Sequence, residues 1–233
     1  MQFNRLTNET CHEAGGVVIV IDVIRAFTVA AYALASGAED ITLVGTVEEA
    51  LGLRERMPDA LVMGEVGGLR PDGFDLGNSP AAVATLDLCG RHLVQRTSAG
   101  TQGVVRSSGA DVLLACSLCC ATATARYVQS LAPQAVTFVI TGIWPGSDEA
   151  NSGDEDVACA DFVETLLRGQ VPDRDEAVRR VLDSYVARKR FLPPDSRLPA
   201  GDLDYCTAVD HVDFAMPVRR EGGRLVLRRG EDH

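Results

Sequence analysis

The chain has 233 residues, of which 46% are hydrophobic and only 5% aromatic, so it is long enough to bury an aliphatic core. Its formal net charge of -11 at pH 7 argues against a nucleic-acid or anionic-membrane partner, because both would repel it. No apolar run approaches the roughly 20 residues that a membrane-spanning helix needs. We therefore expect one α/β unit over residues 1–233, or two lobes divided near residues 130–155.

The N-terminal residues and the cysteines predict the cellular compartment of the protein. Residues 1–16 are polar and lack an apolar core, so no secretory signal is predicted and we expect a cytoplasmic protein. Several of the seven cysteines lie in apolar stretches, which indicates buried, reduced thiols. Cys116 and Cys119 have CxxC spacing, but a structural zinc site needs four ligands and no second such pair exists. The oligomeric state is left open, with a homodimer as one possibility.

Strands rich in β-branched residues alternate with helical segments from residue 17 to residue 141. The predicted strands are 17–21, 41–44, 60–64, 92–96, 111–116 and 135–141, and the predicted helices are 26–36, 46–57, 79–88, 102–107 and 121–131. This alternation predicts a largely parallel sheet with helices on both faces. The remainder predicts a smaller C-terminal α+β part, with an amphipathic helix carrying Cys159 and Phe162, helices over 175–190 and 202–210, and a hairpin over 218–227.

The longest loop lies between the third predicted strand and the Ser79-Pro80 pair. Ser79 reads as a helix N-cap and Pro80 as the first helical residue. Residues 65–78 contain three carboxylates, one arginine and several glycines. Loops longer than about a dozen residues are uncommon in compact domains and are usually functional or disordered. The composition therefore indicates a binding or catalytic site, with an ordinary surface loop as the alternative.

Polar residues follow four of the predicted strands at the point where each ends. Asp22 and Arg25 follow the first strand, residues 65–78 the third, residues 97–101 the fourth and residues 151–156 the sixth. In an open parallel sheet, ligands bind beyond the carboxyl ends of the strands. We therefore expect these segments to converge on one active-site cleft.

The types of residue in these segments predict a reaction class. Carboxylates are the hard oxygen ligands that Mg²⁺ takes, and no histidine cluster indicates a softer metal. Arginines bind phosphate or carboxylate in a bidentate manner, and helix N-termini favour anions. This combination favours magnesium-dependent phosphoryl chemistry over acyl or hydride transfer. The candidate metal ligands are Asp22, Glu65 and Asp156; the candidate catalytic residues are Asp22, Glu65, Asp75 and Glu155; and the candidate substrate-binding residues are Arg25, Arg70, Asn78, Ser79, Thr97, Ser98, Gly100 and Thr101.

Each of these residues also has an ordinary structural interpretation. The acidic run 154–156 complements a helix dipole, Ser79 serves as an N-cap alone, and Thr97 and Ser98 serve as turn residues. Nucleotide-binding glycine motifs and the GxSxG motif are absent from the sequence. No Asp-x-Asp pair follows the first strand, which argues against a phosphatase of the haloacid dehalogenase kind.

Several strings together resemble a known family, the 2-phosphosulfolactate phosphatases. They are residues 20–26, Gly64-Glu65, the string Gly-Phe-Asp-Leu-Gly-Asn-Ser-Pro over 73–80, residues 97–101, Glu155-Asp156 with Cys159-Ala160, and Asp204-Tyr205-Cys206 with Asp210 and Pro217. The resemblance covers nearly the whole chain. It implies Mg²⁺-dependent hydrolysis of a phosphate ester of a small 2-hydroxy acid, classically the sulfonated acid on the route to coenzyme M. It also implies an α/β fold with its site in a cleft, and a small, multiply anionic substrate.

The chain departs from that family at two positions. Val66 stands where the family usually has a basic residue after the glutamate, and Ala99 stands where it usually has asparagine. Hydrogen bonds to charged groups contribute about 1.5–3 kcal/mol each, so these changes favour a different or less charged substrate. Arg70 and Arg96 are candidates to compensate. The alternatives are a non-catalytic anion-binding protein, a phosphomonoesterase of another specificity, and a covalent route through Ser98 or Thr101.

Overall fold

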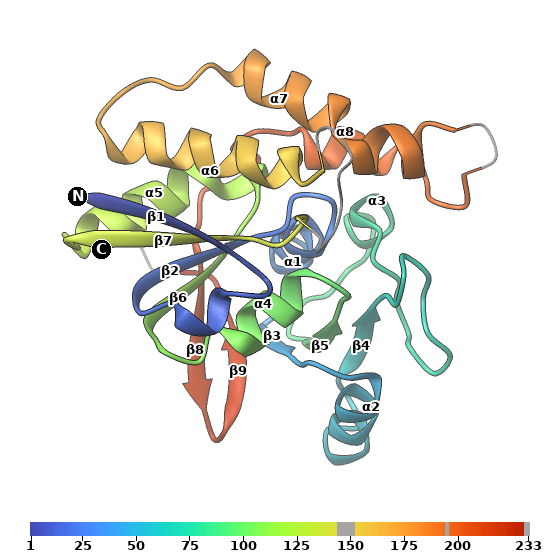
Figure 1. Ribbon diagram of the computed structural model, residues 1–233. Helices are drawn as coiled ribbons and strands as arrows, with labels where there is room; N and C mark the ends of the chain where they lie inside the picture. Colours follow the sequence, from blue (N-terminus) through green and yellow to red (C-terminus); the bar gives the residue numbers. More distant parts are fainter. Residues whose placement is uncertain (144–151, 194–195, 231–233) are drawn as a thin grey trace.

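One nine-stranded sheet runs through the molecule (Figure 1). The computed structural model describes residues 1–143, 152–193 and 196–230. In sheet order, the strands are β1 (Gln2–Thr7), β7 (Ala135–Ile140), β2 (Gly16–Ile21), β6 (Ala110–Cys116), β8 (Met216–Glu221), β9 (Arg224–Leu227), β3 (Asp40–Leu43), β5 (His92–Arg96) and β4 (Leu61–Gly64). The six predicted strands and the predicted hairpin are confirmed. Strand β1 was not predicted, because its sequence is largely polar.

The helices follow the predicted order. They are α1 (Ala26–Ala35), α2 (Val47–Arg56), α3 (Pro80–Val83), α4 (Gly100–Arg106), α5 (Ala121–Ser130), α6 (Asp154–Leu167), α7 (Arg174–Asp183) and α8 (Asp202–Cys206), with 3-10 turns at Cys11–Glu13 and Leu118–Cys120 and a π-helical turn at Ala187–Phe191. Figure 1 shows α5, α6 and α7 packed together on one side of β1 and β7, with α4 on the other side. No helix among these residues is long and apolar enough to cross a membrane.

Three predicted helices are shorter than expected. The prediction of a helix over 79–88 is wrong beyond Val83, since the Thr85 hydroxyl donates to Ala82 O at 2.8 Å and Leu88 N–H bonds to Ser36 O at 3.0 Å. The helix predicted over 175–190 breaks at Ser184, whose backbone is extended.

The helix predicted over 202–210 ends at Cys206. Further along, Asp210 takes a positive φ of 55° and its N–H bonds to Leu118 O, a long-range contact that no local pattern indicates.

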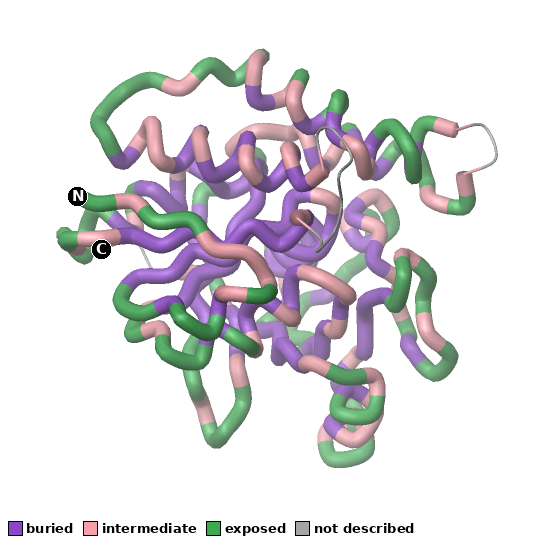
Figure 2. Tube along the Cα trace, in the orientation of Figure 1, coloured by how far each residue is buried: buried purple, intermediate pink, exposed green. Residues whose placement is uncertain are grey.

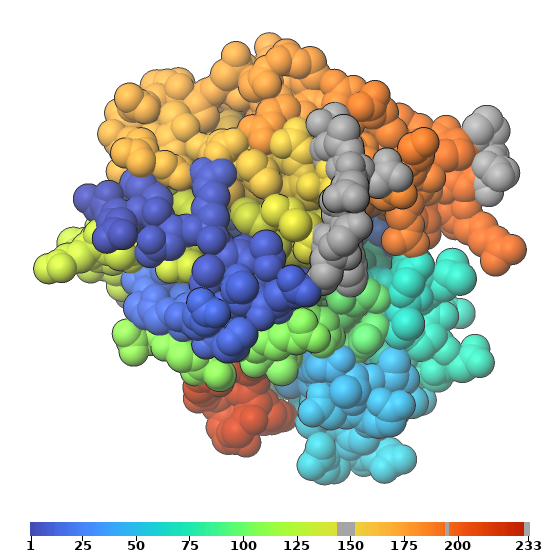
Figure 3. All heavy atoms as spheres, in the orientation of Figure 1, coloured from blue at the N-terminus to red at the C-terminus, as the bar shows by residue number. Residues whose placement is uncertain are grey.

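The C-terminal hairpin changes the topology from the expected one. Strands β1, β7, β2 and β6 form one parallel block, and β3, β5 and β4 form a second. The hairpin β8–β9 lies between the blocks and pairs antiparallel with β6 and with β3. The prediction of a largely parallel sheet therefore holds within each block, while the whole sheet is mixed. The tip of the hairpin projects at the lower edge of the molecule in Figure 3.

Helix α1 lies inside the molecule rather than on its surface. Every residue from Ala26 to Leu34 is buried, and the helix contacts α3, α4 and β6 (Figure 2). A helix that is apolar on all sides is stable only when other elements surround it. Because α1 starts directly after Asp22 and Arg25, this burial fixes the position of the β2–α1 turn.

All seven cysteines are free, and six of them are buried as predicted, with Cys89 exposed. The proposed division into lobes near 130–155 falls partly on residues 144–151, which lie outside the described residues, and it stays a prediction. Asn151, at the start of the acidic segment after β7, also lies outside the described residues.

Candidate active site

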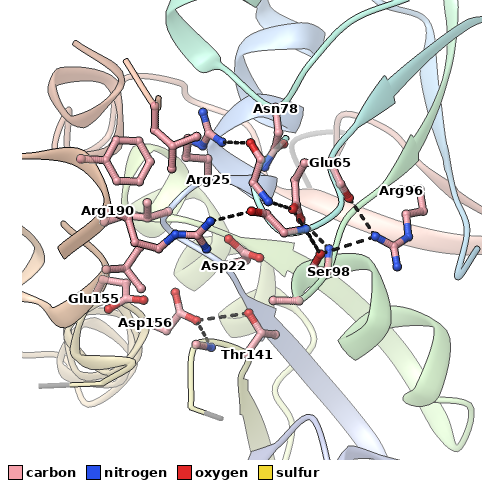
Figure 4. A pocket seen from close by; sticks show the side chains of 18 residues that line it. Asp22, Arg25, Glu65, Asn78, Arg96, Ser98, Thr141, Glu155, Asp156 and Arg190 are labelled. Carbon is pink, nitrogen blue, oxygen red and sulfur yellow. Dashed lines mark hydrogen bonds between the residues drawn. The ribbon is translucent and has the colours of Figure 1, made fainter. Parts of the chain in front are cut away.

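A cavity of about 440 Å³ opens where the β2–α1 turn, the segment after β4, the turn after β5 and the start of α6 meet (Figure 4). Thr141 and Gly142 at the end of β7, and four residues between α7 and α8, also line it: Val186, Arg190, Phe191 and Leu198. Seven of the predicted site residues line this cavity, and they are Asp22, Arg25, Glu65, Asn78, Ser98, Glu155 and Asp156. The structure therefore brings together residues from all four of the segments that follow strands in the sequence.

Asp22 lies at the centre of the cavity (Figure 4). Its Oδ1 accepts the N–H of Ala26, at the start of α1, at 2.9 Å. A Cβ on Gly100 would lie 2.8 Å from Asp22 Oδ2, so only glycine permits this approach of α4. Burial raises the pKa of Asp22 to about 6, and the Glu65 carboxylate adds to the rise, against the lowering effect of the Ala26 N–H.

Glu65 joins the segment after β4 to the turn after β5. Its Oε1 accepts the Ser98 N–H at 2.5 Å, and its Oε2 accepts the Gly68 N–H at 2.5 Å and the Ser98 hydroxyl at 3.1 Å. The Ser98 hydroxyl in turn accepts the N–H of Gly67 at 3.0 Å. Gly67 and Gly68 have φ values of 61° and 91°, which residues with a Cβ rarely adopt. A carboxylate and a hydroxyl are thus held in hydrogen-bond contact at the cavity wall.

Asp156 and Glu155 enter the cavity from the first turn of α6. Asp156 accepts the N–H groups of Val23 and Gly142 at 2.8 and 2.7 Å, and it ties α6 to the ends of β2 and β7. Burial raises the pKa of Asp156, and the charges of Glu155 and Asp22 raise it further. Glu155 Oε2 is buried without a hydrogen-bond partner among the described residues. Burial raises the pKa of Glu155 to about 7, and Asp22 adds to this rise.

All three carboxylates of residues 154–156 lie in the first turn of α6, but only Glu155 and Asp156 line the cavity. Asp154 forms a salt bridge with Arg180 at 2.5 Å and lies outside the cavity. Glu155 and Asp156 are only 2% exposed, and they face the other carboxylates. Carboxylates that raise each other's pKa in a cavity are a common feature of functional sites.

Three guanidinium groups line the cavity. Arg25 is 6% exposed, pairs with Asp202 at 2.7 Å and stacks over the Phe191 ring at 5.1 Å. Arg96 donates to Glu65 O at 2.8 Å and to Gly45 O at 3.3 Å. Arg190 donates to Gly67 O at 2.6 Å.

The sequence named Arg96 only as a candidate to compensate for Val66 and Ala99, and it did not place Arg190 in the site. Arg96 ends a strand whose exit was already a candidate, and this was the available signal. Arg190 continues the polar face of a predicted helix, so the sequence gives no signal for it.

Other predicted residues of the long loop are engaged away from the cavity. Asp75 Oδ2 accepts the Val62 N–H at 2.8 Å, and Arg70 donates to the Asp75 carbonyl at 3.0 Å. The Ser79 hydroxyl accepts the Ala82 N–H at 3.3 Å as an N-cap and donates to Asp202 at 2.6 Å. These contacts hold the loop and α3 in place.

Thr97 and Thr101 bind each other at the entry to α4. The Thr101 hydroxyl accepts the Thr97 N–H at 2.9 Å and donates to the Thr97 carbonyl at 3.0 Å. Both residues are buried and neither lines the cavity. This pair fixes the turn that presents Ser98, and the turn brings the Gly100 backbone against Asp22.

The cavity carboxylates are suitable ligands for a divalent cation that is also bound by water or substrate. Among the described residues, no group of three or more histidine, cysteine, aspartate or glutamate side chains is arranged to hold a metal ion by itself. Mg²⁺ usually keeps several waters and binds through one or two carboxylates together with substrate phosphate. The unpartnered Glu155 Oε2 and the raised pKa values of Asp22 and Glu155 fit such a cation, which would stabilise both charged forms. Glu65 and Asp156 fit less well, because their oxygens already accept hydrogen bonds.

Comparison with known proteins agrees with the resemblance in the motifs. A model of the 2-phosphosulpholactate phosphatase family matches residues 4–220. A probable 2-phosphosulfolactate phosphatase from Bacillus subtilis (strain 168) is 38% identical over 212 residues, which cover 91% of this chain and 90% of that protein. A protein of the same name from Carboxydothermus hydrogenoformans is 31% identical over 225 residues, which cover 90% and 89%. The chain therefore belongs to the 2-phosphosulfolactate phosphatase family.

Proposed function

We propose that this protein is a Mg²⁺-dependent phosphatase that hydrolyses the phosphate monoester of a small 2-hydroxy acid, with 2-phosphosulfolactate as the first candidate substrate. The observation that carries the proposal is the meeting of four buried carboxylates with three guanidinium groups in one cavity, in a chain of this family. Hydrolysis of such an ester cleaves the phosphorus–oxygen bond and releases the hydroxy acid and phosphate.

Asp22 and Glu155 are the residues that would hold the cation. Mg²⁺ bound there would neutralise charge on the phosphate oxygens during the reaction. Asp156 positions both ligands, since it bonds to the N–H after Asp22 and lies next to Glu155 in α6.

Glu65 is placed to accept a proton from the attacking water. Its Oε2 accepts the Ser98 hydroxyl at 3.1 Å, so a water bound beside Ser98 lies within reach of the same carboxylate. The same pair is also the arrangement of a nucleophilic hydroxyl and its base. Of the two residues considered for a covalent route, Ser98 lines the cavity and Thr101 does not. The covalent route forms a phosphorylated serine, and it gives a burst of hydroxy acid release when hydrolysis of that intermediate is the slow step.

Asn78 offers a neutral contact for the substrate. Its side chain lines the cavity, and its Oδ1 is buried without a partner among the described residues. A side-chain amide donates as well as accepts, so its Nδ2 group suits the ester oxygen next to a phosphate. We therefore assign Asn78 to substrate orientation.

Phosphate release from a substrate panel tests the proposal. The panel contains 2-phosphosulfolactate, 2-phospholactate and phosphate esters that lack an acid group, assayed with Mg²⁺, then with a chelator, then with Mg²⁺ restored. We expect release from the acid esters that stops with chelator and returns with Mg²⁺. Binding of these esters without release would support the non-catalytic alternative instead. Release from other monoesters alone would support a different specificity.

A further inference from the structure

Two of the three cavity arginines are already committed to protein acceptors. Arg25 is buried against the Asp202 carboxylate and also donates to Gly68 O at 3.3 Å. Arg96 has three acceptors, the carbonyls of Gly45 and Glu65 and the Ser98 hydroxyl. A guanidinium has five N–H donors in a planar fork, so Arg25 already uses two of them and Arg96 three, and the charge of Arg25 is paired with Asp202.

Arg190 is in a different position. Among the described residues its guanidinium has one acceptor, Gly67 O at 2.6 Å, and no carboxylate within ion-pair distance. Figure 4 shows it reaching toward Asp22 from the side opposite Arg96. Most of its donors are therefore available to a group bound in the cavity.

The backbone that carries Arg190 is firmly placed although the side chain itself is exposed. The π-helical turn Ala187–Phe191 buries Ala187 and Phe191 in a small apolar cluster with Leu203. Phe191 also packs under the Arg25 guanidinium. Arg190 is thus presented at the cavity mouth by an anchored turn, and the Gly67 carbonyl fixes one of its N–H groups.

The long loop does not supply a cation of its own to the cavity. Its single arginine, Arg70, donates to Asp75 O and does not line the cavity. Val186, Phe191 and Leu198, from the same segment as Arg190, are apolar residues that also line the cavity.

From these observations we propose that Arg190 recognises the second anionic group of the substrate, the carboxylate or sulfonate on its carbon chain. The inference rests on the proposed function, since it assigns one end of the same substrate. Asp22 and Glu155 would hold the cation that neutralises the phosphate charge. The planar guanidinium takes the acid group through its remaining N–H donors.

The test compares Arg190→Gln with Lys189→Gln, which removes the neighbouring exposed cation outside the cavity. The measured quantity is kcat/KM for 2-phospholactate divided by kcat/KM for isopropyl phosphate, which has the same branched carbon without the acid group. Loss of a charged hydrogen-bond contact is expected to lower this ratio about 10- to 100-fold in Arg190→Gln. Lys189→Gln is expected to keep the wild-type ratio, and Arg190→Lys to fall between. A ratio for Arg190→Gln within twofold of wild type overturns the inference.

A binding measurement separates this inference from the proposed function. If the wild-type protein releases phosphate from none of the esters, the proposed function fails. Calorimetric titration with sulfolactate and lactate then tests Arg190 alone. Binding by wild type that is lost in Arg190→Gln supports the recognition role. Equal binding by both proteins, or binding by neither, overturns it.

Discussion

The two halves of the loop between β4 and α3 have similar compositions and different places in the structure. In the first half, Glu65, Gly67 and Gly68 line the cavity. In the second half, Asp75 bonds to the Val62 N–H and Phe74 is buried at 5% exposure against the β4 side of the sheet. Both halves contain glycine, a carboxylate and an apolar residue, so composition alone does not separate a cavity wall from a structural segment. The two kinds of segment are distinguished by the hydrogen-bond partners of their carboxylates.

The second half protects an edge of the sheet. Strand β4 is the last strand, and Leu76 forms an isolated bridge with Met63 while Asp75 N–H bonds to Val62 O at 2.8 Å. An exposed edge strand otherwise presents unpaired N–H and carbonyl groups. The most specific string of the family resemblance, residues 73–80, is therefore largely architectural in this structure, with Asn78 as its member in the cavity.

The largest effect is expected from Glu65→Gln, in the first half of the loop. The amide retains the shape but cannot accept a proton, so kcat/KM for 2-phosphosulfolactate should fall about 100-fold or more. Steady-state phosphate release measures it, and Asp72→Asn, an exposed carboxylate of the same loop, is the matched control. Wild-type activity in Glu65→Gln would mean that the first half is as structural as the second.

The buried carboxylates predict a pH dependence of stability in the protein without Mg²⁺. The folded state raises the pKa of Asp22 from 3.8 to about 6 and that of Glu155 from 4.5 to about 7, chiefly by burial. The folded state thus binds protons more tightly than the unfolded state, so stability is highest below the ordinary values and is lost as pH rises through about 7. Thermal unfolding should show Tm falling between pH 4 and pH 7.5, and added Mg²⁺ should reverse the fall at the upper end. A Tm that rises across this range without Mg²⁺ would contradict the account.

In the second half of the loop, Asp75→Ala should cost stability rather than catalysis. It leaves the buried Val62 N–H without its side-chain acceptor, a loss of about 1–3 kcal/mol. Urea unfolding measures this change, while kcat/KM of the folded variant should stay within about threefold of wild type. If Asp75→Ala instead unfolds like wild type and loses activity, Asp75 acts in the reaction and the comparison of the two halves fails.

The smallest effect is expected from Arg70→Gln. Its guanidinium is exposed and its described contact is the Asp75 carbonyl at 3.0 Å, so stability should change by about 0.5 kcal/mol or less. Substrate KM should be unchanged because the side chain does not line the cavity. A tenfold rise in KM would show that Arg70 moves into the site when substrate binds.

Local patterns predicted the parts of the site that follow directly from strands. The β-branched run 17–21 and the glycine-rich exits after β4 and β5 place Asp22, Glu65 and Ser98 on the cavity. The position of the hairpin between two parallel blocks depends on pairing between residues far apart in sequence, so no local pattern indicates it. The amphipathic pattern of 175–190 continues past the break at Ser184, and this hid the turn that presents Arg190.

The roles of the carboxylates also depend on contacts between residues far apart in the sequence. Asp75 and Glu65 are both carboxylates of the same loop, and the sequence makes each a candidate catalytic residue. Only their hydrogen-bond partners in the folded structure distinguish them. Val62 N–H lies opposite Asp75, whereas Ser98 lies opposite Glu65. A single sequence carries no information about such partners unless they are neighbours along the chain.

Phosphate release from 2-phosphosulfolactate by Asp22→Asn in the presence of Mg²⁺ tests most directly whether this cavity is the active site. Asparagine keeps the oxygen that accepts the Ala26 N–H at 2.9 Å, so the start of α1 and the fold should be preserved, as urea unfolding will show. We expect kcat/KM to fall at least about 100-fold in this folded variant. Release at the wild-type rate by folded Asp22→Asn would contradict the assignment of this cavity as the active site.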